Sequence, residues 1–194
     1  MLERLPFPTN IRSARTDWLP AAQQAAFRQI MKGFAYPGRL GRLDTEAEHA
    51  LPLLLATLVD RSNRLADPRQ LLAADEYRRL GSRASSPESA QFVVLPGICP
   101  PDFQPMLGSL ENPEQGATLI VVAERLAAGA GLRLSGPGID GAASVAVQGI
   151  DPLWWQKREQ WNAGFPLGVD MIVVAGRQVL GLPRTVRIDT KGDN

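Results

Sequence analysis

Histidine and cysteine are almost absent from the 194-residue sequence, which holds one of each, His49 and Cys99. A single cysteine cannot form an internal disulfide, which fits a reducing cytoplasm. A His–Cys metal cluster and a Ser–His–Asp triad with a spare histidine are nearly excluded. His49 itself lies in EAEHALPLLL, where we expect an exposed residue in the first turn of a helix. We therefore expect no metal site.

Lysine is also scarce, since three lysines, Lys32, Lys157 and Lys191, stand beside eighteen arginines. The first two fall in predicted helices among polar neighbours and the third lies in the polar tail. None is placed as the desolvated amine that a Schiff-base enzyme requires. We therefore expect no cofactor, neither pyridoxal phosphate nor nicotinamide. The arginine excess suits planar recognition of phosphate or carboxylate, but a GC-rich genome produces the same bias.

Long apolar runs and charge of one sign are missing as well. The longest apolar run, residues 51–59, is too short to span a bilayer, and the first ten residues do not have the pattern of a signal peptide. The net charge is +1, so no strong field points to nucleic acid or to a membrane surface. We expect a cytoplasmic protein that binds neither.

No Walker-type phosphate loop, G-x-x-x-x-G-K-[ST], occurs in the chain. The stretch GPGIDG, residues 136–141, has the spelling of a dinucleotide fingerprint, but Pro137 removes a backbone N–H that a pyrophosphate would need. The following AASVAV has the pattern of a strand rather than a helix N-terminus. We interpret GPGIDG as a tight turn, because glycine tolerates positive φ.

Helical and strand patterns are mixed along the chain. Helices are predicted at 20–38, 46–60, 70–80 and 151–164, and strands at 39–43, 90–95, 116–124, 131–139, 142–147 and 185–189, with a two-stranded hairpin within 165–185. Apart from the short helix, residues 61–87 are expected to be irregular. The first helix carries an apolar stripe at helical spacing, formed by Phe27, Ile30, Met31 and Phe34.

No shift in composition marks a second domain. We predict a single α/β domain over residues 1–194, in which a mixed β-sheet is flanked by helices. Residues 1–19 and 190–194 are expected to be irregular tails.

The helix at 151–164 has clear boundaries, with Asp151 as the expected N-cap and Pro152 in the first turn. Trp154 and Trp161 fall on one face, seven residues apart. Such a pair could stack on a nucleobase, but packing on a sheet or a subunit partner is more common. This helix is our candidate interface, because aromatic anchors are enriched at such surfaces.

Residues 165–185, FPLGVDMIVVAGRQVLGLPRT, predict a hairpin that ends at Pro-Arg-Thr. Asp170 alternates onto the face of Ile172 and Val174, where a buried carboxylate needs a partner. With a three-residue turn the ladder places Asp170 opposite Arg184, and with a two-residue turn it places Asp170 opposite Pro183.

A pair between Asp170 and Arg184 is the attractive interpretation, and Arg28 of the first helix is the alternative partner. The pair could be structural, closing the hairpin and fixing its register. It could instead hold Arg184, with Thr185 beside it, ready for an anion. We favour the structural role.

Several stretches resemble sequences of the PhnH family, whose members are subunits of the bacterial carbon–phosphorus lyase system for phosphonate use. They are FRQIM with YPG, GATLIV, LSGPGI, and FPLGVD followed by LPRT, and their order and spacing match from about residue 21 to residue 188. Residues 61–87 show little of the pattern. The family-motif residues are Phe27, Pro37, Gly38, Gly138, Phe165, Pro166, Gly168 and Pro183.

The resemblance implies a homodimer that joins other carbon–phosphorus lyase subunits in a core complex. Together these help to transfer the ribose triphosphate of ATP to a phosphonate, displacing adenine, and the chemistry is placed on partner subunits. It also implies a reduced form of the pyridoxal-phosphate-dependent transferase fold without the cofactor, and it leaves room for a phosphonate or ATP-derived ligand.

Two functional classes stay open. One is a non-catalytic or site-contributing subunit of alpha-D-ribose 1-methylphosphonate 5-triphosphate synthase. The other is a stand-alone enzyme that acts on a small phosphorylated or phosphonate substrate through arginines and Asp170. The scarcity of histidine and lysine favours the first, since proton transfer would fall to carboxylates alone. The sequence identifies no catalytic residue.

Overall fold

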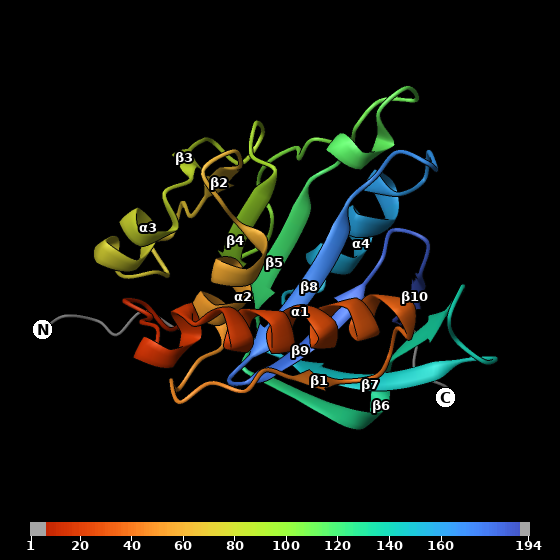
Figure 1. The fold of residues 1–194 in the computed structure, drawn as a ribbon. Coiled ribbons are helices and arrows are strands. Elements are labelled where there is room, and N and C mark those ends of the chain that lie inside the picture. The colour runs from red at the N-terminus through yellow and green to blue at the C-terminus, as the bar shows by residue number, and fades with distance from the viewer. Residues whose placement is uncertain (1–6, 191–194) are drawn as a thin grey trace, which may run out of the picture.

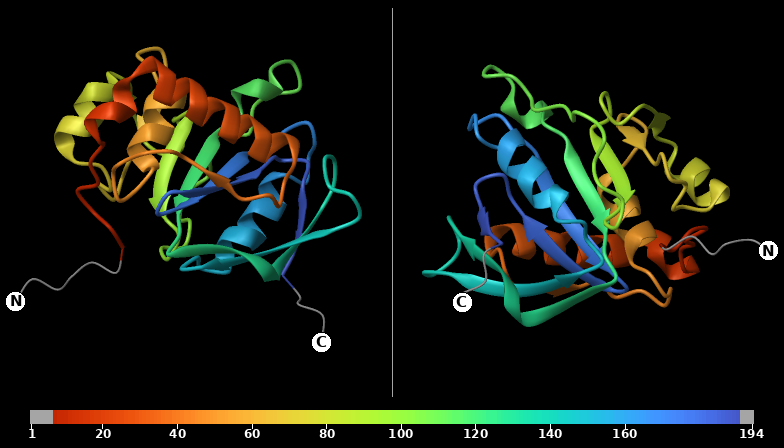
Figure 2. Two further views of the ribbon diagram at one scale, coloured as in Figure 1. Left: turned by 60° about the horizontal axis from the view of Figure 1, so that its bottom comes forward. Right: turned by 180° about the vertical axis from the view of Figure 1, so that it is seen from behind.

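The computed structural model describes residues 7–190, which form three layers (Figure 1). A seven-stranded sheet lies in the middle. Helices α1, α2 and α3 cover one of its faces, and helix α4 with a three-stranded sheet covers the other (Figure 2). The predicted α/β class with a mixed sheet flanked by helices is confirmed.

The central sheet has the strand order β1-β9-β8-β5-β4-β2-β3. Its strands are β1 (Gly41–Arg42), β2 (Arg64–Ala66), β3 (Arg83–Ala84), β4 (Phe92–Pro96), β5 (Thr118–Val122), β8 (Asp170–Ala175) and β9 (Gln178–Leu182). Strand β9 is antiparallel to both of its neighbours, and the pairs from β8 across to β3 are parallel. The central strands β4, β5 and β8 are rich in β-branched residues because both of their faces are buried.

The remaining elements form the outer layers. They are α1 (Pro20–Ala35), α2 (Leu51–Leu58), α3 (Ala74–Leu80), α4 (Leu153–Trp161), β6 (Arg125–Ser135), β7 (Ala143–Gln148), β10 (Arg187–Asp189) and the 3₁₀ helices Arg15–Trp18 and Pro113–Gln115. The small sheet has the order β10-β6-β7. Residues 136–141 join β6 to β7 as the predicted turn, and Gly136, Gly138 and Gly141 all have positive φ.

Helix α1 faces the sheet with a different side from the one predicted. Ile30 is buried, but Phe27 is 47% exposed and Met31 is 51% exposed. The inner face uses the small residues Ala26 and Gly33 instead. A Cβ on Gly181 of β9 would lie 2.8 Å from the carbonyl carbon of Gly33, so glycine on both elements allows a close approach that larger residues would prevent.

His49 lies outside the helix in which we expected it. Helix α2 begins at Leu51, with Pro52 in its first turn. The imidazole is mostly enclosed, and its Nδ1 accepts a hydrogen bond from the Leu51 N–H at 3.1 Å. Burial lowers the pKa of His49 to about 4, so the expected exposed histidine is wrong.

Two segments expected to be irregular contain regular structure. Residues 61–87 hold β2 and β3 as well as α3. The two strands were not predicted because strands of three and two residues are too short to show a period. Within residues 7–19, Arg15–Trp18 forms a 3₁₀ helix and Ile11 pairs with Leu72 in a β-bridge. Residues 1–6 and 191–194 lie outside the described residues. Within residues 7–190, no helix combines the length and apolarity needed to cross a membrane.

Candidate functional site

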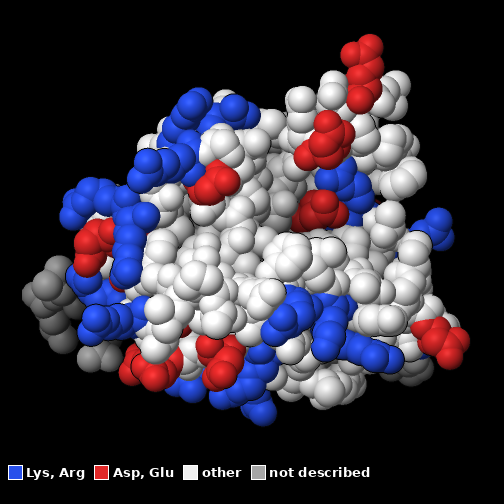
Figure 3. Space-filling view, viewed as in Figure 1, with Lys and Arg blue, Asp and Glu red and all other residues white. Residues whose placement is uncertain are grey.

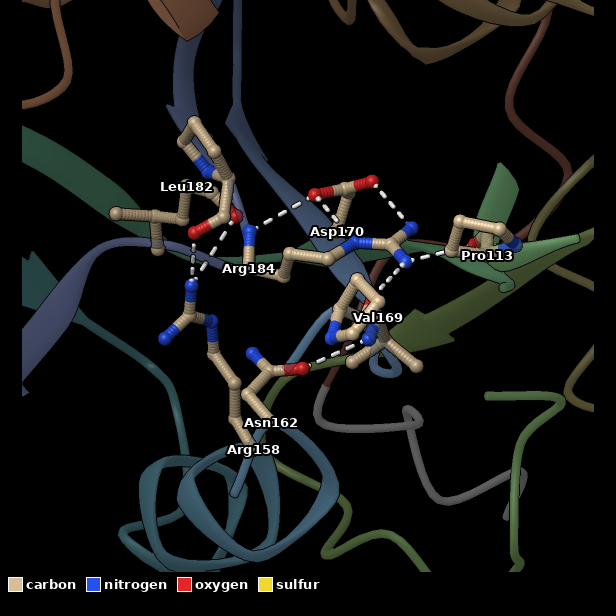
Figure 4. A network of polar contacts seen from close by, with 9 residues as sticks. Pro113, Arg158, Asn162, Val169, Asp170, Leu182 and Arg184 are labelled. Carbon is tan, nitrogen blue, oxygen red and sulfur yellow. Dashed lines mark hydrogen bonds and ion pairs between the residues drawn. The ribbon is translucent and has the colours of Figure 1, made fainter. Parts of the chain in front are cut away.

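Asp170, at the start of β8, forms an ion pair with Arg184, two residues beyond the end of β9 (Figure 4). The Arg184 Nη2 lies 2.9 Å from the Asp170 Oδ2, and the Arg184 backbone N–H donates to the Oδ1 at 2.8 Å. The Asp170 side chain is 27% exposed and the Arg184 side chain is 13% exposed. The pair is therefore partly screened from water.

The strand register differs from the one that predicted this pair. Ala175 pairs with Gln178 and Met171 with Leu182, so the turn has two residues and the ladder would place Asp170 opposite Pro183. The pair forms nevertheless because the chain leaves β9 at Leu182. The Arg184 side chain is then no longer bound to a cross-strand position. The three-residue turn is wrong, and the contact that it suggested is present.

The Arg184 guanidinium is almost fully occupied by protein acceptors. Besides the carboxylate, its Nη1 donates to the carbonyl oxygens of Pro113 at 2.8 Å and Pro166 at 3.1 Å, and its Nε approaches the Asp170 Oδ1 at 3.5 Å. Pro166 follows a cis peptide bond. Arg184 thus joins the 3₁₀ helix at 113, the α4–β8 connection and the start of β8.

We call Asp170, Arg184 and the carbonyl groups of Pro113 and Pro166 the clamp. Two glycines make room for it. A side chain on Gly116 would overlap the Gly168 carbonyl and lie 3.0 Å from the Arg184 Nη2. Gly168 has a φ of +144°, and a side chain there would overlap the Oδ1 of Asn162. That Oδ1 accepts the Val169 N–H at 2.7 Å. Gly168 is therefore required by both its backbone conformation and its surroundings.

A second arginine, Arg158 of α4, lies inside the clamp and was not predicted. Its side chain is 3% exposed. It donates to the carbonyl oxygens of Val186 at 3.0 Å, Leu182 at 3.3 Å and Pro183 at 2.5 Å. Burial lowers the pKa of Arg158 to about 10, and the nearby Asp170 carboxylate acts in the opposite direction. The guanidinium therefore stays charged at neutral pH.

A sequence signal for Arg158 exists. It follows Trp154 by four residues and precedes Trp161 by three, so it shares the buried face of α4 with both. Asn162, at the end of α4, lies close to Arg158 in Figure 4. The Nε of Arg158 and the Nδ2 of Asn162 are buried without a hydrogen-bond partner among the described residues.

The motif residues Pro37, Gly38 and Gly138 meet at a second place, where the end of α1 packs on the β6–β7 turn. A Cβ on Gly38 would lie 2.6 Å from the Cβ of Ala143, and one on Gly138 would overlap the Ala35 carbonyl. Both glycines have positive φ. These residues position two elements and carry no titratable group.

The other predicted site residues lie apart from the clamp. Arg28 is exposed on α1, and its side chain makes no hydrogen bond or ion pair with any described residue, so the alternative pair with Asp170 is wrong. Thr185 is exposed beside Arg184, and Phe165 is 68% exposed. Pro183 contributes its carbonyl to Arg158.

The tryptophans of helix α4 face the interior of the protein rather than an exposed interface. Trp154 is 0% exposed and Trp161 is 4% exposed. Both rings pack near Phe103, with centroid distances of 6.5 Å and 6.0 Å. The N-cap of α4 is Pro152 rather than the expected Asp151, although the Asp151 Oδ1 accepts the Leu153 N–H at 2.8 Å. Packing on the sheet therefore explains the pair, and the predicted interface on these tryptophans is wrong.

Within residues 7–190, no group of three His, Cys, Asp or Glu side chains is arranged to hold a metal ion. Lys32 is exposed on α1 and Lys157 is half-buried on α4, and Lys191 lies outside the described residues. The clamp sits where the parallel strands β5 and β8 begin, whereas α/β proteins bind ligands beyond the carboxyl ends of such strands. The geometry of the clamp suits a role in holding chain segments together, because the N–H groups of the Arg184 guanidinium already donate to oxygen atoms of the protein.

Comparison with known proteins gives consistent matches. The model of a family described as "Bacterial phosphonate metabolism protein (PhnH)" matches residues 15–189. A protein named "Putative C-P lyase subunit protein HtxG" from Stutzerimonas stutzeri is 52% identical over 175 residues, which cover 90% of each chain. The "Alpha-D-ribose 1-methylphosphonate 5-triphosphate synthase subunit PhnH" of Rhizobium meliloti (strain 1021) is 31% identical over 179 residues, 86% of this chain and 90% of the relative.

Proposed function

The chain belongs to the PhnH family of bacterial phosphonate metabolism proteins, and we propose that it is a carbon–phosphorus lyase subunit with a supporting role in phosphonate breakdown. The Rhizobium relative is named as a subunit of alpha-D-ribose 1-methylphosphonate 5-triphosphate synthase, and we assign to this chain a part in the same synthesis, in which ribose triphosphate is transferred from ATP to a phosphonate. We place this complex in the cytoplasm and assign the catalytic groups to partner subunits.

One observation carries the supporting role. The motif stretches FPLGVD and LPRT contribute a carboxylate and a guanidinium, yet four of the five N–H groups of Arg184 already have protein acceptors. An arginine saturated in this way has little capacity left for a phosphonate. The same observation weighs against the alternative, a stand-alone enzyme that works through Asp170 and Arg184.

The outer face of α1 is our candidate surface for a partner subunit. Phe27 and Met31 lie one turn apart on it, and both are about half exposed. Figure 3 shows an uncharged area over α1 with basic side chains along one edge. Arg28, Lys32 and Arg39 are the exposed basic residues of this region.

Charge decides which partner suits this face. A second copy of the chain would bring Arg28 and Lys32 against their equivalents, and like charges at an interface oppose association. The face instead fits an apolar segment with acidic neighbours on another core subunit. The homodimer implied by the family stays part of the proposal, but it would use another surface.

The likeness to a cofactor-free pyridoxal-phosphate-dependent transferase also stays a proposal. The mixed seven-stranded sheet with the single reversed strand β9 supports it, and the exposed and half-buried positions of Lys32 and Lys157 offer no site for an internal aldimine. Absorbance of the purified protein tests the absence of pyridoxal phosphate, because a bound aldimine gives a band in the visible range.

Co-expression with the other core subunits of the same bacterium tests the proposed function. We expect a complex of fixed stoichiometry on size exclusion that releases adenine from ATP with methylphosphonate, whereas the chain alone releases none. The double variant Phe27→Ser/Met31→Ser should be lost from the complex. Its matched control is Leu110→Ser, because Leu110 is 76% exposed and lies in the loop before the 3₁₀ helix Pro113–Gln115 rather than on α1. Adenine release by the chain alone would contradict the proposal.

A further inference from the structure

A cavity of about 810 Å³ lies at the edge of the central sheet, away from the clamp. It is lined by the loop after β2, by α3, by the end of β3 and by residues 9 and 10 of the N-terminal segment. The chain runs from β2 outward to β3 and returns to β4 on the other side of β2. The sheet order therefore reverses at β2, and ligands of α/β proteins bind beyond the carboxyl ends of strands at such a reversal.

Two free arginines line this cavity. Arg69 and Arg78 are exposed, and neither guanidinium group makes a hydrogen bond or ion pair with a described residue. Residues 61–84 carry six arginines and three acidic residues, and Figure 3 shows basic side chains gathered over α3 and the β2–β3 edge. Unlike Arg184, these guanidinium groups keep all their donors for an anionic ligand.

Asp67 gives the cavity an acceptor of opposite character. Its Oδ1 and Oδ2 accept the backbone N–H groups of Leu71 at 2.9 Å and Leu72 at 3.0 Å, which fixes the carboxylate and leaves each oxygen one further lone pair. Burial raises the pKa of Asp67, against the lowering by these two hydrogen bonds. A fixed, partly desolvated carboxylate of this kind is suited to sugar hydroxyl groups.

The backbone around the cavity is strained. Asn10 has a φ of +56° and Gln70 has a φ of +52°, and they are the non-glycine residues with positive φ among those that the structure describes. Both line this cavity. Asparagine tolerates the left-handed region better than glutamine does. Strain of this kind gathers at functional sites, where the surrounding structure maintains it.

We propose that this cavity binds a phosphorylated sugar, with its phosphate held by Arg69 and Arg78 and its hydroxyl groups held by Asp67. The ring of Tyr77 forms one wall, and its hydroxyl group is anchored to the Leu65 carbonyl at 2.7 Å. A bare phosphate would fill a small part of the space and would gain nothing from the carboxylate. The choice of ribose 5-phosphate as a probe rests on the proposed function, in which a phosphorylated ribose is transferred, whereas the cavity itself belongs to this chain alone.

Calorimetric titration of the full chain with ribose 5-phosphate, inorganic phosphate and ribose tests the site. We expect ribose 5-phosphate to bind about tenfold more tightly than inorganic phosphate, and ribose alone to show no binding. Arg69→Gln and Arg78→Gln should each weaken the binding of ribose 5-phosphate about tenfold, since each removes a charged hydrogen-bond donor. The control is Arg187→Gln on β10, which is exposed and outside the cavity.

Three outcomes would overturn the proposal. They are no binding of ribose 5-phosphate by the wild-type chain, equal affinity for inorganic phosphate, and equal weakening by Arg187→Gln. Co-expression of Arg69→Gln/Arg78→Gln with the core subunits separates the two proposals. A cavity variant that assembles normally but has lost ribose 5-phosphate supports the site, whereas a failure of the wild-type chain to assemble contradicts only the proposed function.

Discussion

The Asp170 carboxylate receives both the backbone N–H and the guanidinium of Arg184, at 2.8 Å and 2.9 Å, although the strand ladder of β8 and β9 does not pair the two residues. The contact therefore belongs to the chain reversal after β9 rather than to the sheet. It ties the position of residue 184 to the first residue of β8.

Asp170→Asn tests this relationship. The substitution keeps the shape of the side chain and removes its charge, which leaves a partly buried guanidinium without its counter-ion. We expect a loss of about 3 kcal/mol in the free energy of unfolding, the lower end for broken buried pairs, because both groups keep some exposure. Urea denaturation measures it, and Glu114→Gln, an exposed carboxylate nearby, is the control. Unchanged stability together with an inactive complex would instead assign Asp170 to substrate.

Arg158→Met should destabilise the chain at least as strongly. The variant removes donors from the carbonyl groups of Val186, Leu182 and Pro183, and each buried acceptor left without a partner costs about 1–3 kcal/mol. Lys157→Met, the adjacent half-buried residue, should change the midpoint of denaturation little. Equal midpoints for the two variants would contradict the role given to Arg158.

Gly168→Ala should destabilise the protein by more than about 1 kcal/mol, because alanine is disfavoured at positive φ and its Cβ would overlap Asn162. Gly164→Ala is the matched control, since its Cβ would meet nothing within 4 Å. Thermal unfolding compares the two. Similar melting temperatures would show that the α4–β8 connection adapts to a side chain.

His49 should make stability depend on pH between about 6.5 and 4. The folded-state pKa of about 4 lies below the ordinary value of 6.5. The unfolded chain therefore takes up a proton first as the pH falls, and the stability present above pH 6.5 is lost. Between pH 7 and pH 5 the loss from this residue should be about 2 kcal/mol. His49→Asn keeps a hydrogen-bond acceptor and should remove that part of the pH dependence. A variant with the same pH profile as the wild type would exclude His49 as its source.

The sequence contained enough information to find Asp170 and its partner but not the geometry between them. A carboxylate in an apolar strand signals a required partner, and few arginines were near enough in the chain to supply it. The ladder was a poor guide because Arg184 lies beyond the strand end. Arg158 was missed because buried arginines are rare, although its spacing from Trp154 and Trp161 placed it on the buried face.

The fold, too, could be predicted from the sequence only in part. Long strands such as β5 and β8 were predicted because their apolar runs are strong, whereas β2 and β3 became visible only through their pairing with β4 and with each other. The side of α1 that faces the sheet was misjudged because Phe27 and Met31 outweigh Ala26 and Gly33 in any hydrophobicity pattern. Close approach through small residues is a property of two surfaces, and one helix does not reveal it.

Strands β8 and β2 are separated by β5 and β4 in the central sheet, so the clamp and the cavity are at least roughly 14 Å apart at the usual strand spacing. Free-energy changes at sites this far apart are generally additive. The two regions are therefore thermodynamically independent, so substitutions that alter ligand preference at the β2–β3 edge can accumulate without compensating changes at the clamp.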